Sequence, residues 1–206
     1  MKVRAFTKTY DKRRVLDFSG FDFEPSKIYA ILGANGSGKS TFAKIISGIE
    51  ACDDSKPVVS EESLGYMPQH SYAFRMTTLK NVMLGGADED TALEALRRIG
   101  IEALAEKKGN KLSGGETARM ALARLLVKHF DTVVLDEPCA SMDIKSIKLA
   151  EQMIEEYCKR ENATVIMVTH SLSQARRIAD EILYFHEGSL VDASSDEVAE
   201  FLKFFD

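Results

Sequence analysis

The chain has 206 residues, of which 45% are hydrophobic and 29% charged, and its formal net charge is −5. This composition is typical of one globular domain with a sizeable core, with or without an inserted lobe. The acidic balance argues against a nucleic-acid partner, whose binding surface would carry a basic excess, but a nucleotide needs only a few local donors.

The pattern of the first third of the chain predicts short strands, then one helix and a further short strand. Apolar and polar residues alternate between turn signals over 2–27, which predicts an antiparallel β part, and the apolar run 28–32 predicts a buried strand. The segment 39–50 has a helical pattern that Gly48 would terminate. Residues 51–63 are polar and turn-like, and 64–69 predict another short strand.

The middle of the chain, from 77 to 128, has a helical pattern throughout. The segments "TLKNVML", "DEDTALEALRRIG" and "ETARMALARLLVKH" each place apolar residues at i, i+3 and i+4. We therefore predict a mostly helical lobe, inserted into the rest of the domain over approximately 70–128.

The last third returns to alternating strands and helices. Apolar strands are predicted at 132–138 and 163–170 around an amphipathic helix at 144–161, then a helix at 171–180. A hairpin turning at Glu187 and Gly188 and a capped helix at 194–205 follow. Two buried strands separated by a helix indicate a mostly parallel sheet flanked by helices, so we predict one α/β domain over 1–206, with its core at approximately 1–69 and 129–206.

Cysteine usage and hydropathy narrow the expected location. The three cysteines lack metal-ligand spacing and no signal peptide is apparent, so we expect reduced thiols in a cytoplasmic protein. The apolar runs are too short to cross a bilayer, so any membrane association would be peripheral, through a partner.

The stretch "GANGSGKS" matches G-x-x-x-x-G-K-[ST] in full, directly after a predicted strand and at the start of a helix. Its backbone N–H groups would surround the β- and γ-phosphates, Lys39 would reach their oxygens, and the Ser40 hydroxyl would ligate Mg²⁺. The alternative, a glycine-rich turn without a ligand, does not explain the lysine, so we predict a P-loop NTPase core. The predicted binding residues are Gly33, Ala34, Asn35, Gly36, Ser37, Gly38, Lys39, Ser40 and Thr41.

The stretch "TVVLDE" places Asp136 and Glu137 at the exit of a buried strand. In phosphate-loop proteins an aspartate at this place holds Mg²⁺, and the next carboxylate can polarise an attacking water. Two acids could also merely cap a strand or begin a helix. Because they follow a phosphate loop on a second core strand, we predict that Asp136 is a metal ligand and Glu137 the catalytic base.

The stretch "LSGGE", after the helical lobe and before "LDEP", resembles the signature of the ATP-binding-cassette (ABC) ATPases. The resemblance extends, with motifs in the family's order, over essentially the whole chain. It implies that Tyr10 stacks on the adenine of ATP and that Gln69, in "YMPQH", links the γ-phosphate and Mg²⁺ to the helical lobe. It further implies that His170, in "VTH", senses the γ-phosphate, which makes Gln69 and His170 catalytic residues beside Glu137.

The family resemblance also implies a head-to-tail dimer of two ATPase chains. Ser113, Gly114 and Gly115 of one chain would cap the ATP held by the phosphate loop of the other, and Asp143, in "CASMD", would lie in the loop that crosses the interface. The sequence departs from the family's commoner pattern at Glu116, at Ala118 and in the run of residues 139–142 before Asp143. Glu116 stands where glutamine is more frequent, which places a negative charge near the nucleotide, and Ala118 replaces a common glutamine. We interpret these departures as tolerated variants, because no proposed catalytic group is missing.

ABC ATPases most often power transport, and this chain most resembles the ATPases of prokaryotic importers. The expected partners are a second ATPase subunit, identical or a paralogue, and membrane-spanning subunits that dock on a groove formed by residues 69–84, which places the chain on the inner face of the cell membrane. The stretch 171–192 looks like those of oxyanion importers, such as importers of tungstate, molybdate or phosphate. The alternative is a soluble scaffold of the iron–sulfur assembly type. An ATPase subunit does not touch the transported solute, so the resemblance to oxyanion importers is one of sequence and not of site chemistry.

Overall fold

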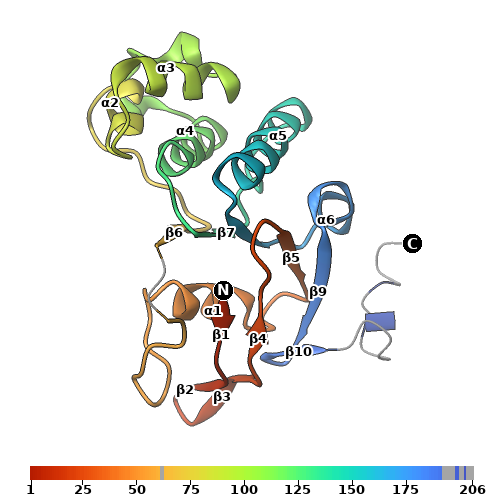
Figure 1. Cartoon of the computed structure of the whole chain (residues 1–206). Helices are drawn as coiled ribbons and strands as arrows, with labels where there is room; N and C mark the ends of the chain where they lie inside the picture. Colours follow the sequence, from red (N-terminus) through yellow and green to blue (C-terminus); the bar gives the residue numbers. More distant parts are fainter. Residues whose placement is uncertain (61–62, 192–197, 200–201, 203–206) are drawn as a thin grey trace.

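The centre of the molecule is a six-stranded sheet with the order β10-β9-β5-β8-β7-β6 (Figure 1). The computed structural model describes residues 1–60, 63–191, 198–199 and 202. Strand β10 pairs antiparallel with β9, and the other strand pairs of this sheet are parallel. The predicted mostly parallel sheet is therefore confirmed. Its strands are β5 (Ile28–Leu32), β6 (Leu64–Met67), β7 (Thr132–Asp136), β8 (Thr164–Val168), β9 (Glu181–His186) and β10 (Ser189–Val191).

The N-terminal segment forms two small antiparallel sheets, as the alternation predicted. Strand β1 (Lys2–Val3) pairs with β4 (Phe21–Asp22), and β2 (Phe6–Tyr10) pairs with β3 (Arg13–Phe18). The turn between β2 and β3 uses Asp11 and Lys12, which both have positive φ values of 45° and 67°. Such a turn matches the twist of the two strands it joins.

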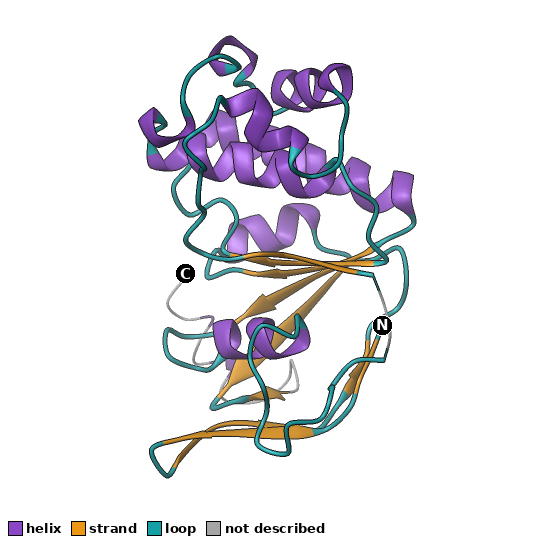
Figure 2. Cartoon of the chain, turned by 90° about the vertical axis from the view of Figure 1, so that its left-hand side faces the viewer, coloured by secondary structure: helices purple, strands orange, loops and turns teal. Residues whose placement is uncertain are grey.

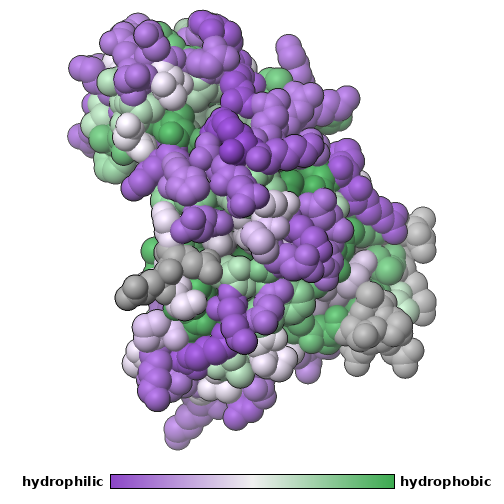
Figure 3. Space-filling model, viewed as in Figure 1, coloured by the Kyte–Doolittle hydropathy of each residue, from purple (hydrophilic) through white to green (hydrophobic). Residues whose placement is uncertain are grey.

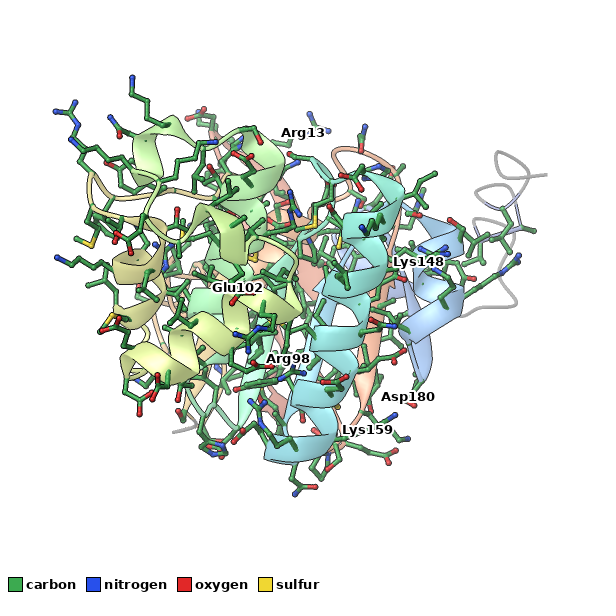
Figure 4. All side chains as sticks on the ribbon, turned by 90° about the horizontal axis from the view of Figure 1, so that it is seen from above. Arg13, Arg98, Glu102, Lys148, Lys159 and Asp180 are labelled. Atoms are coloured by element: carbon green, nitrogen blue, oxygen red, sulfur yellow. The ribbon has the colours of Figure 1, made fainter. Side chains whose placement is uncertain are left out.

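Helices cover both faces of the central sheet. Figure 2 shows most of the helices stacked on one face, with α1 (Lys39–Ile46) and the N-terminal strands on the opposite face. On the side of the larger layer, Arg98 of α3 pairs with Glu156 of α5 where the two helices lie side by side in Figure 4. The helices of this layer are α2 (Thr78–Met83), α3 (Glu89–Arg98), α4 (Gly114–Leu126), α5 (Ile144–Glu161) and α6 (Leu172–Ile178).

Successive residues of the central strands supply two separate cores. In β5, Ala30 and Leu32 pack with α2–α6, whereas Tyr29 and Ile31 pack with α1 and the N-terminal strands. Every residue of β5, β7 and β8 is buried. A strand covered on both faces is mostly apolar, which is why these strands are nearly continuous apolar runs in the sequence. The buried polar residues of β7 and β8 stand at strand ends and are Thr132, Asp136 and Thr164. The surface of the molecule contrasts with these apolar strands, because hydrophilic side chains predominate on the face shown in Figure 3.

The helices α2, α3, α5 and α6 each begin immediately after a side chain that satisfies one of their free backbone N–H groups. A cap of this kind typically contributes about 1 kcal/mol to a helix and fixes its first residue. The capping residues are Thr77 for α2, Asp88 for α3, Asp143 for α5 and Ser171 for α6. One of them, Asp143, is itself a predicted site residue, and Ser171 directly follows another, His170.

The structure corrects some predicted boundaries. Between α3 and α4 the chain is not continuously helical: Gly100, with φ 73°, ends α3, and two short 3₁₀ turns follow at Glu102–Leu104 and Gly109–Lys111. Strand β6 ends before Pro68, which lacks the N–H that a longer strand would need. Of the predicted helix at 194–205, Val198, Ala199 and Leu202 are helical, and the rest lies outside the described residues.

The cysteines and the hydropathy of the described helices agree with the sequence-based predictions. Cys52, Cys139 and Cys158 are free and buried, as expected for reduced thiols. Among the described residues, no helix combines the length and the apolarity that crossing a membrane requires. The division into core and lobe near residues 70 and 128 stays a prediction.

Candidate active site

The loop between β5 and α1 has a backbone that only glycine adopts freely at its key positions. Gly36 and Gly38 have φ values of 81° and 103°, in the region that residues with a side chain rarely enter. At Gly33 the restriction is space, because a Cβ there would overlap the carbonyl oxygen of Phe185 in β9. The loop is therefore wrapped tightly between β5, α1 and β9, with its backbone N–H groups at the start of a helix, where an anion is favoured.

Lys39, the first residue of α1, is curled into this loop. The residue is only 6% exposed, and Nζ donates to the carbonyl oxygens of Gly33 and Ala34 at 2.8 Å each. Burial lowers the pKa of Lys39, while Glu137 and Asp136 act in the opposite direction. The loop thus carries a nearly dehydrated cation at its centre, as a triphosphate site requires.

A hydroxyl and a carboxylate meet at the ends of α1 and β7. The Ser40 hydroxyl donates to Asp136 Oδ1 at 3.1 Å, and Asp136 is only 1% exposed. Burial raises the pKa of Asp136, against the hydrogen bond from Ser40, which lowers it. The described residues contain no cluster of three or more His, Cys, Asp or Glu side chains suited to a metal. Mg²⁺ does not need one, because it takes one or two carboxylates and fills its remaining positions with phosphate oxygens and water.

Glu137 follows Asp136 in a strained conformation. Its φ of 50° is left-handed, and its N–H donates to the carbonyl oxygen of Val168 at 2.9 Å, which fixes it to the end of β8. A left-handed residue with a side chain costs about 1–2 kcal/mol, and such strain is concentrated at functional sites. This turn orients the Glu137 carboxylate so that it contacts two other predicted catalytic residues.

Gln69 and His170 converge on the Glu137 carboxylate from opposite sides. Gln69 Nε2 donates to Oε2 at 3.2 Å, and His170 Nδ1 lies 3.3 Å from Oε1. The Glu137 side chain is 14% exposed and that of His170 58% exposed. Three residues far apart in the sequence, placed by β6, β7 and β8, therefore meet at one edge of the sheet, as the carboxyl ends of parallel strands do.

These groups line one open cavity of about 850 Å³. The cavity brings the phosphate loop together with Gln69, Glu137 and His170, and Asp136, which is not in its lining, is hydrogen-bonded to the lining residue Ser40. Its lining consists of Val15, Gly33, Ala34, Asn35, Gly36, Gly38, Lys39, Ser40, Thr41, Gln69, Glu137 and His170.

Tyr10 stands at the end of β2 and is 41% exposed. Its hydroxyl donates to Glu50, and Lys8 Nζ lies 3.0 Å from Glu50 Oε1 and 4.9 Å from the centre of the ring. Burial, followed by the contact with Glu50, raises the pKa of Tyr10 to about 12, so the hydroxyl remains a donor at any physiological pH. Glu50 and Lys8 therefore both contact Tyr10 and restrict where its ring can lie.

The signature residues form a second group at the start of α4. The Ser113 hydroxyl accepts from the Glu116 N–H at 3.3 Å, and the Glu116 carboxylate accepts from the Ser113 N–H at 2.8 Å. This reciprocal pair, a capping box, begins the helix at Gly114, two residues before the predicted start.

The loop that ends at Asp143 packs against this group. A Cβ on Gly115 would lie 2.6 Å from the carbonyl oxygen of Ser141, so glycine permits the close approach, and the Asp143 carboxylate caps α5 through the N–H of Ser146 at 2.9 Å. Ser113, Gly114, Gly115 and Asp143 are absent from the lining of the cavity at the chain's own phosphate loop. The predicted site residues therefore form two groups on one chain, and Tyr10, at the end of β2, lies outside the lining of the cavity.

Several residues around the cavity had no signal in the sequence. Val15 lines it from β3, and Lys8 and Glu50 fix Tyr10. The hairpin turn at Gly188 was predicted, but not that its N–H donates to the carbonyl oxygen of Ser37 at 2.9 Å and so supports the phosphate loop. Contacts of this kind depend on strand pairing between distant segments, which local patterns do not encode.

The sequence and the fold are similar to those of known proteins. Residues 16–140 match the family model described as "ABC transporter". The tungstate uptake system ATP-binding protein TupC of Peptoclostridium acidaminophilum is 36% identical, over 93% of this chain and 96% of the relative. The zinc import ATP-binding protein ZnuC of Vibrio vulnificus is 31% identical over 97% and 78%. The aliphatic sulfonates import ATP-binding protein SsuB of Rhizobium johnstonii is 31% identical over 92% and 78%.

Among solved structures, a dimeric ATP-binding cassette in a post-hydrolysis state bound to ADP and Pi has a TM-score of 0.81. It is 26% identical, and the match covers 93% of this chain and 96% of that one. The matched family model spans the phosphate loop, Gln69, the signature and the acidic strand end, whereas Tyr10, Asp143 and His170 lie outside the matched residues. The chain therefore belongs to the ABC transporter family, as one of its ATP-hydrolysing subunits.

Proposed function

We propose that this chain hydrolyses Mg²⁺-ATP at the cavity of its phosphate loop and thereby powers a membrane importer. The observation that carries the proposal is the convergence of Gln69 and His170 on the Glu137 carboxylate at 3.2 and 3.3 Å, beside a phosphate loop with its lysine in place. A nucleotide-binding module without turnover would need no such carboxylate.

In this mechanism the loop N–H groups and Lys39 bind the β- and γ-phosphates, and the Tyr10 ring stacks on the adenine. Ser40 and Asp136 would hold Mg²⁺, with the Gln69 carbonyl as a third oxygen, and the ion would withdraw charge from the γ-phosphate. Glu137 accepts a hydrogen bond from the attacking water and polarises it. His170 approaches the same carboxylate from the other side, where it can contact the γ-phosphate.

The second group, Ser113 to Gly115 with Asp143, would complete the site of another chain. Two observations support this use: these residues are absent from the lining of the chain's own cavity, and a dimeric cassette is among the similar structures. The N-terminus of α4 offers backbone N–H groups to an anion, and a lysine there would be redundant because the partner's Lys39 supplies one.

A second groove offers a place for the membrane subunits. Its volume is about 620 Å³, and Tyr72, Leu84 and Arg124 line it where α2 and α4 meet the core next to Gln69. Tyr72 and Leu84 are 62% and 54% exposed, and neighbouring Phe74 is 44% exposed. Such an apolar cluster on a hydrophilic surface is typical of an interaction site. Docking there would place the chain on the cytoplasmic face of the membrane. The membrane subunits would then lie next to Gln69, which contacts Glu137.

For the solute we propose an oxyanion. The support is the match to TupC, which at 36% identity covers nearly the full length of both chains. Relatives named for zinc and for sulfonates match at 31%. A soluble scaffold is the weaker alternative, because the named relatives are subunits of uptake systems and the exposed groove beside Gln69 fits a partner that must be moved by ATP.

Two measurements test the proposal separately. Purified protein should release phosphate from Mg²⁺-ATP, and the Glu137→Gln variant should not; equal rates would exclude the proposed chemistry. Deleting the gene in its host should reduce uptake of tungstate, molybdate or phosphate, measured as the element inside the cells, while zinc uptake is unchanged. A selective loss of zinc would overturn the oxyanion proposal and leave the ATPase proposal intact.

A further inference from the structure

Glu116, the acidic residue of the signature, is paired with a cation of its own chain. Glu116 lies in the first turn of α4, and its Oε2 accepts from the Ser113 N–H at 2.8 Å and from Lys107 Nζ at 2.9 Å. The two side chains are partly exposed, Lys107 at 35% and Glu116 at 21%. The hydrogen bond from Lys107 makes the largest contribution to lowering the pKa of Glu116, so the carboxylate is ionised at neutral pH.

An ionised carboxylate in the first turn of α4 would repel an anion that binds at the N-terminus of this helix. The N-terminus of a helix attracts anions, and the phosphates of an ATP held by a second chain would approach the same turn. A glutamine would present no charge there, whereas Glu116 does. Its charge is compatible with a bound triphosphate only when a cation neutralises it within the same chain.

The backbone of Lys107 is anchored independently of its ammonium group. The Lys107 carbonyl oxygen accepts from both the N–H and the hydroxyl of Thr78, each at 2.9 Å, and Thr78 is fully buried at the start of α2. A substitution that removes the ammonium group keeps these hydrogen bonds. The role of the charge can therefore be tested without unfolding the segment.

We propose that Lys107 is a positioning residue for the ATP-dependent pairing of two chains: it neutralises Glu116 and so keeps Ser113 and the start of α4 receptive to the partner's triphosphate. The inference rests on the proposed head-to-tail use of the signature and adds the residue on which that use depends. It also explains how the unusual glutamate is tolerated. Because a partly exposed ion pair contributes little to folding, its removal should weaken pairing and leave stability nearly unchanged.

The test uses four full-length proteins, all with Glu137→Gln so that bound ATP persists. They are the parent and its Lys107→Met, Glu116→Gln and double Lys107→Met/Glu116→Gln derivatives. Light scattering during an ATP titration gives the ATP concentration at which half of the protein is dimeric. Lys107→Met should raise it about tenfold, equivalent to about 1.4 kcal/mol, and the double variant should return to within about twofold of the parent.

Two further readouts separate positioning from structure. Raising the salt concentration should shrink the Lys107→Met defect, because screening weakens repulsion between a carboxylate and a triphosphate. The midpoint of thermal unfolding, and the affinity for a fluorescent ATP analogue at protein concentrations too low for dimers, should match the parent. Lowered stability in Lys107→Met that Glu116→Gln does not restore would make Lys107 a structural residue and overturn the inference.

The outcomes also distinguish this inference from the function on which it rests. If the parent dimerises with ATP and Lys107→Met does so at the same ATP concentration, Lys107 has no positioning role and the head-to-tail model stands. If none of the four proteins, the parent included, dimerises with ATP, the head-to-tail model is wrong and the role of Lys107 falls with it. Rescue by Glu116→Gln is the result that supports both.

Discussion

The amide nitrogen of Gln69 donates a hydrogen bond of 3.2 Å to Oε2 of Glu137. Gln69 follows β6 and begins the segment that leads through the exposed Tyr72 to α2, whereas Glu137 ends β7. One contact therefore joins the carboxylate proposed to activate water with the segment proposed to meet the membrane subunits. A displacement of that segment by a partner would move an amide that touches the reacting groups.

Replacing the proposed base tests the chemistry. Glu137→Gln keeps the size of the side chain but removes the charge that polarises water, and general-base catalysis typically contributes 10²–10⁴-fold. Turnover should fall by at least about 100-fold while ATP affinity is retained. Phosphate release and calorimetric ATP binding measure the two. Turnover like that of the unaltered protein would remove Glu137 from the mechanism.

Ser113→Arg tests whether the signature acts on another chain's nucleotide. The bulky cation would block the start of α4, so hydrolysis should be abolished, while ATP binding to the isolated monomer should stay nearly intact because Ser113 is absent from the lining of its own cavity. Comparing hydrolysis with binding to dilute protein separates the two effects. Binding lost in proportion to hydrolysis would mean that Ser113 contacts the ATP of its own chain.

The contacts of Tyr10 predict an effect on KM without one on kcat. Glu50→Ala removes the acceptor of the Tyr10 hydroxyl and the partner of Lys8, so the ring is no longer held for stacking. KM for ATP should rise several-fold, at the scale of about 1 kcal/mol for a lost hydrogen bond, and kcat should not change. Hydrolysis of inorganic triphosphate, which has no base to stack, is the control. An equal effect on that substrate would contradict the assignment.

The phosphate loop offers a matched pair of glycine substitutions. A Cβ at Gly33 would overlap the carbonyl oxygen of Phe185, whereas a Cβ at Gly36 meets nothing within 4 Å and suffers only the strain of its positive φ. Gly33→Ala should therefore lower the free energy of unfolding by about 2–4 kcal/mol, and Gly36→Ala by about 1 kcal/mol. Denaturant unfolding of the nucleotide-free protein measures both. Equal losses would show that the loop can move away from β9.

Asp136 is expected to lower stability at neutral pH. Burial raises its pKa in the folded state, so its contribution is fully favourable only below the unfolded pKa and is lost as the pH rises through the folded value. Asp136→Asn should therefore stabilise the nucleotide-free protein at pH 7, and the gain should shrink as the pH falls. It should also abolish Mg²⁺-dependent hydrolysis. A variant less stable than the parent at pH 7 would show that the bond from Ser40 outweighs the cost of burial.

Patterns that are local in the sequence predicted most of the fold. The buried strand at 28–32, the helix at 144–161 and the turn at Glu187 and Gly188 were found where expected, because continuous apolar runs, helical periodicity and turn residues act within a few positions. The segment between α3 and α4 was not predicted well. Its short 3₁₀ turns depend on contacts with α2, such as that between Lys107 and Thr78, which lie outside any local window.

The residues of the candidate site were predicted by type and spacing, but their contacts were not. The motif of the phosphate loop predicted Lys39 and Ser40, and the resemblance predicted Gln69 and His170. Their meeting at Glu137 depends on the order of β6, β7 and β8 in the sheet and on the left-handed turn at Glu137. The pairing of Glu116 with Lys107 was also missed, because the sequence shows the charge but not the ammonium group that approaches across the loop.

The central claim is that ATP completes its site by joining two chains. The solution mass of the Glu137→Gln variant, measured by light scattering with and without Mg²⁺-ATP, tests it most directly. We expect a monomer without nucleotide and a dimer with ATP, and the addition of Ser113→Arg should restore the monomer. A protein that stays monomeric at saturating ATP, or a dimer that ignores both ATP and Ser113→Arg, would contradict the account.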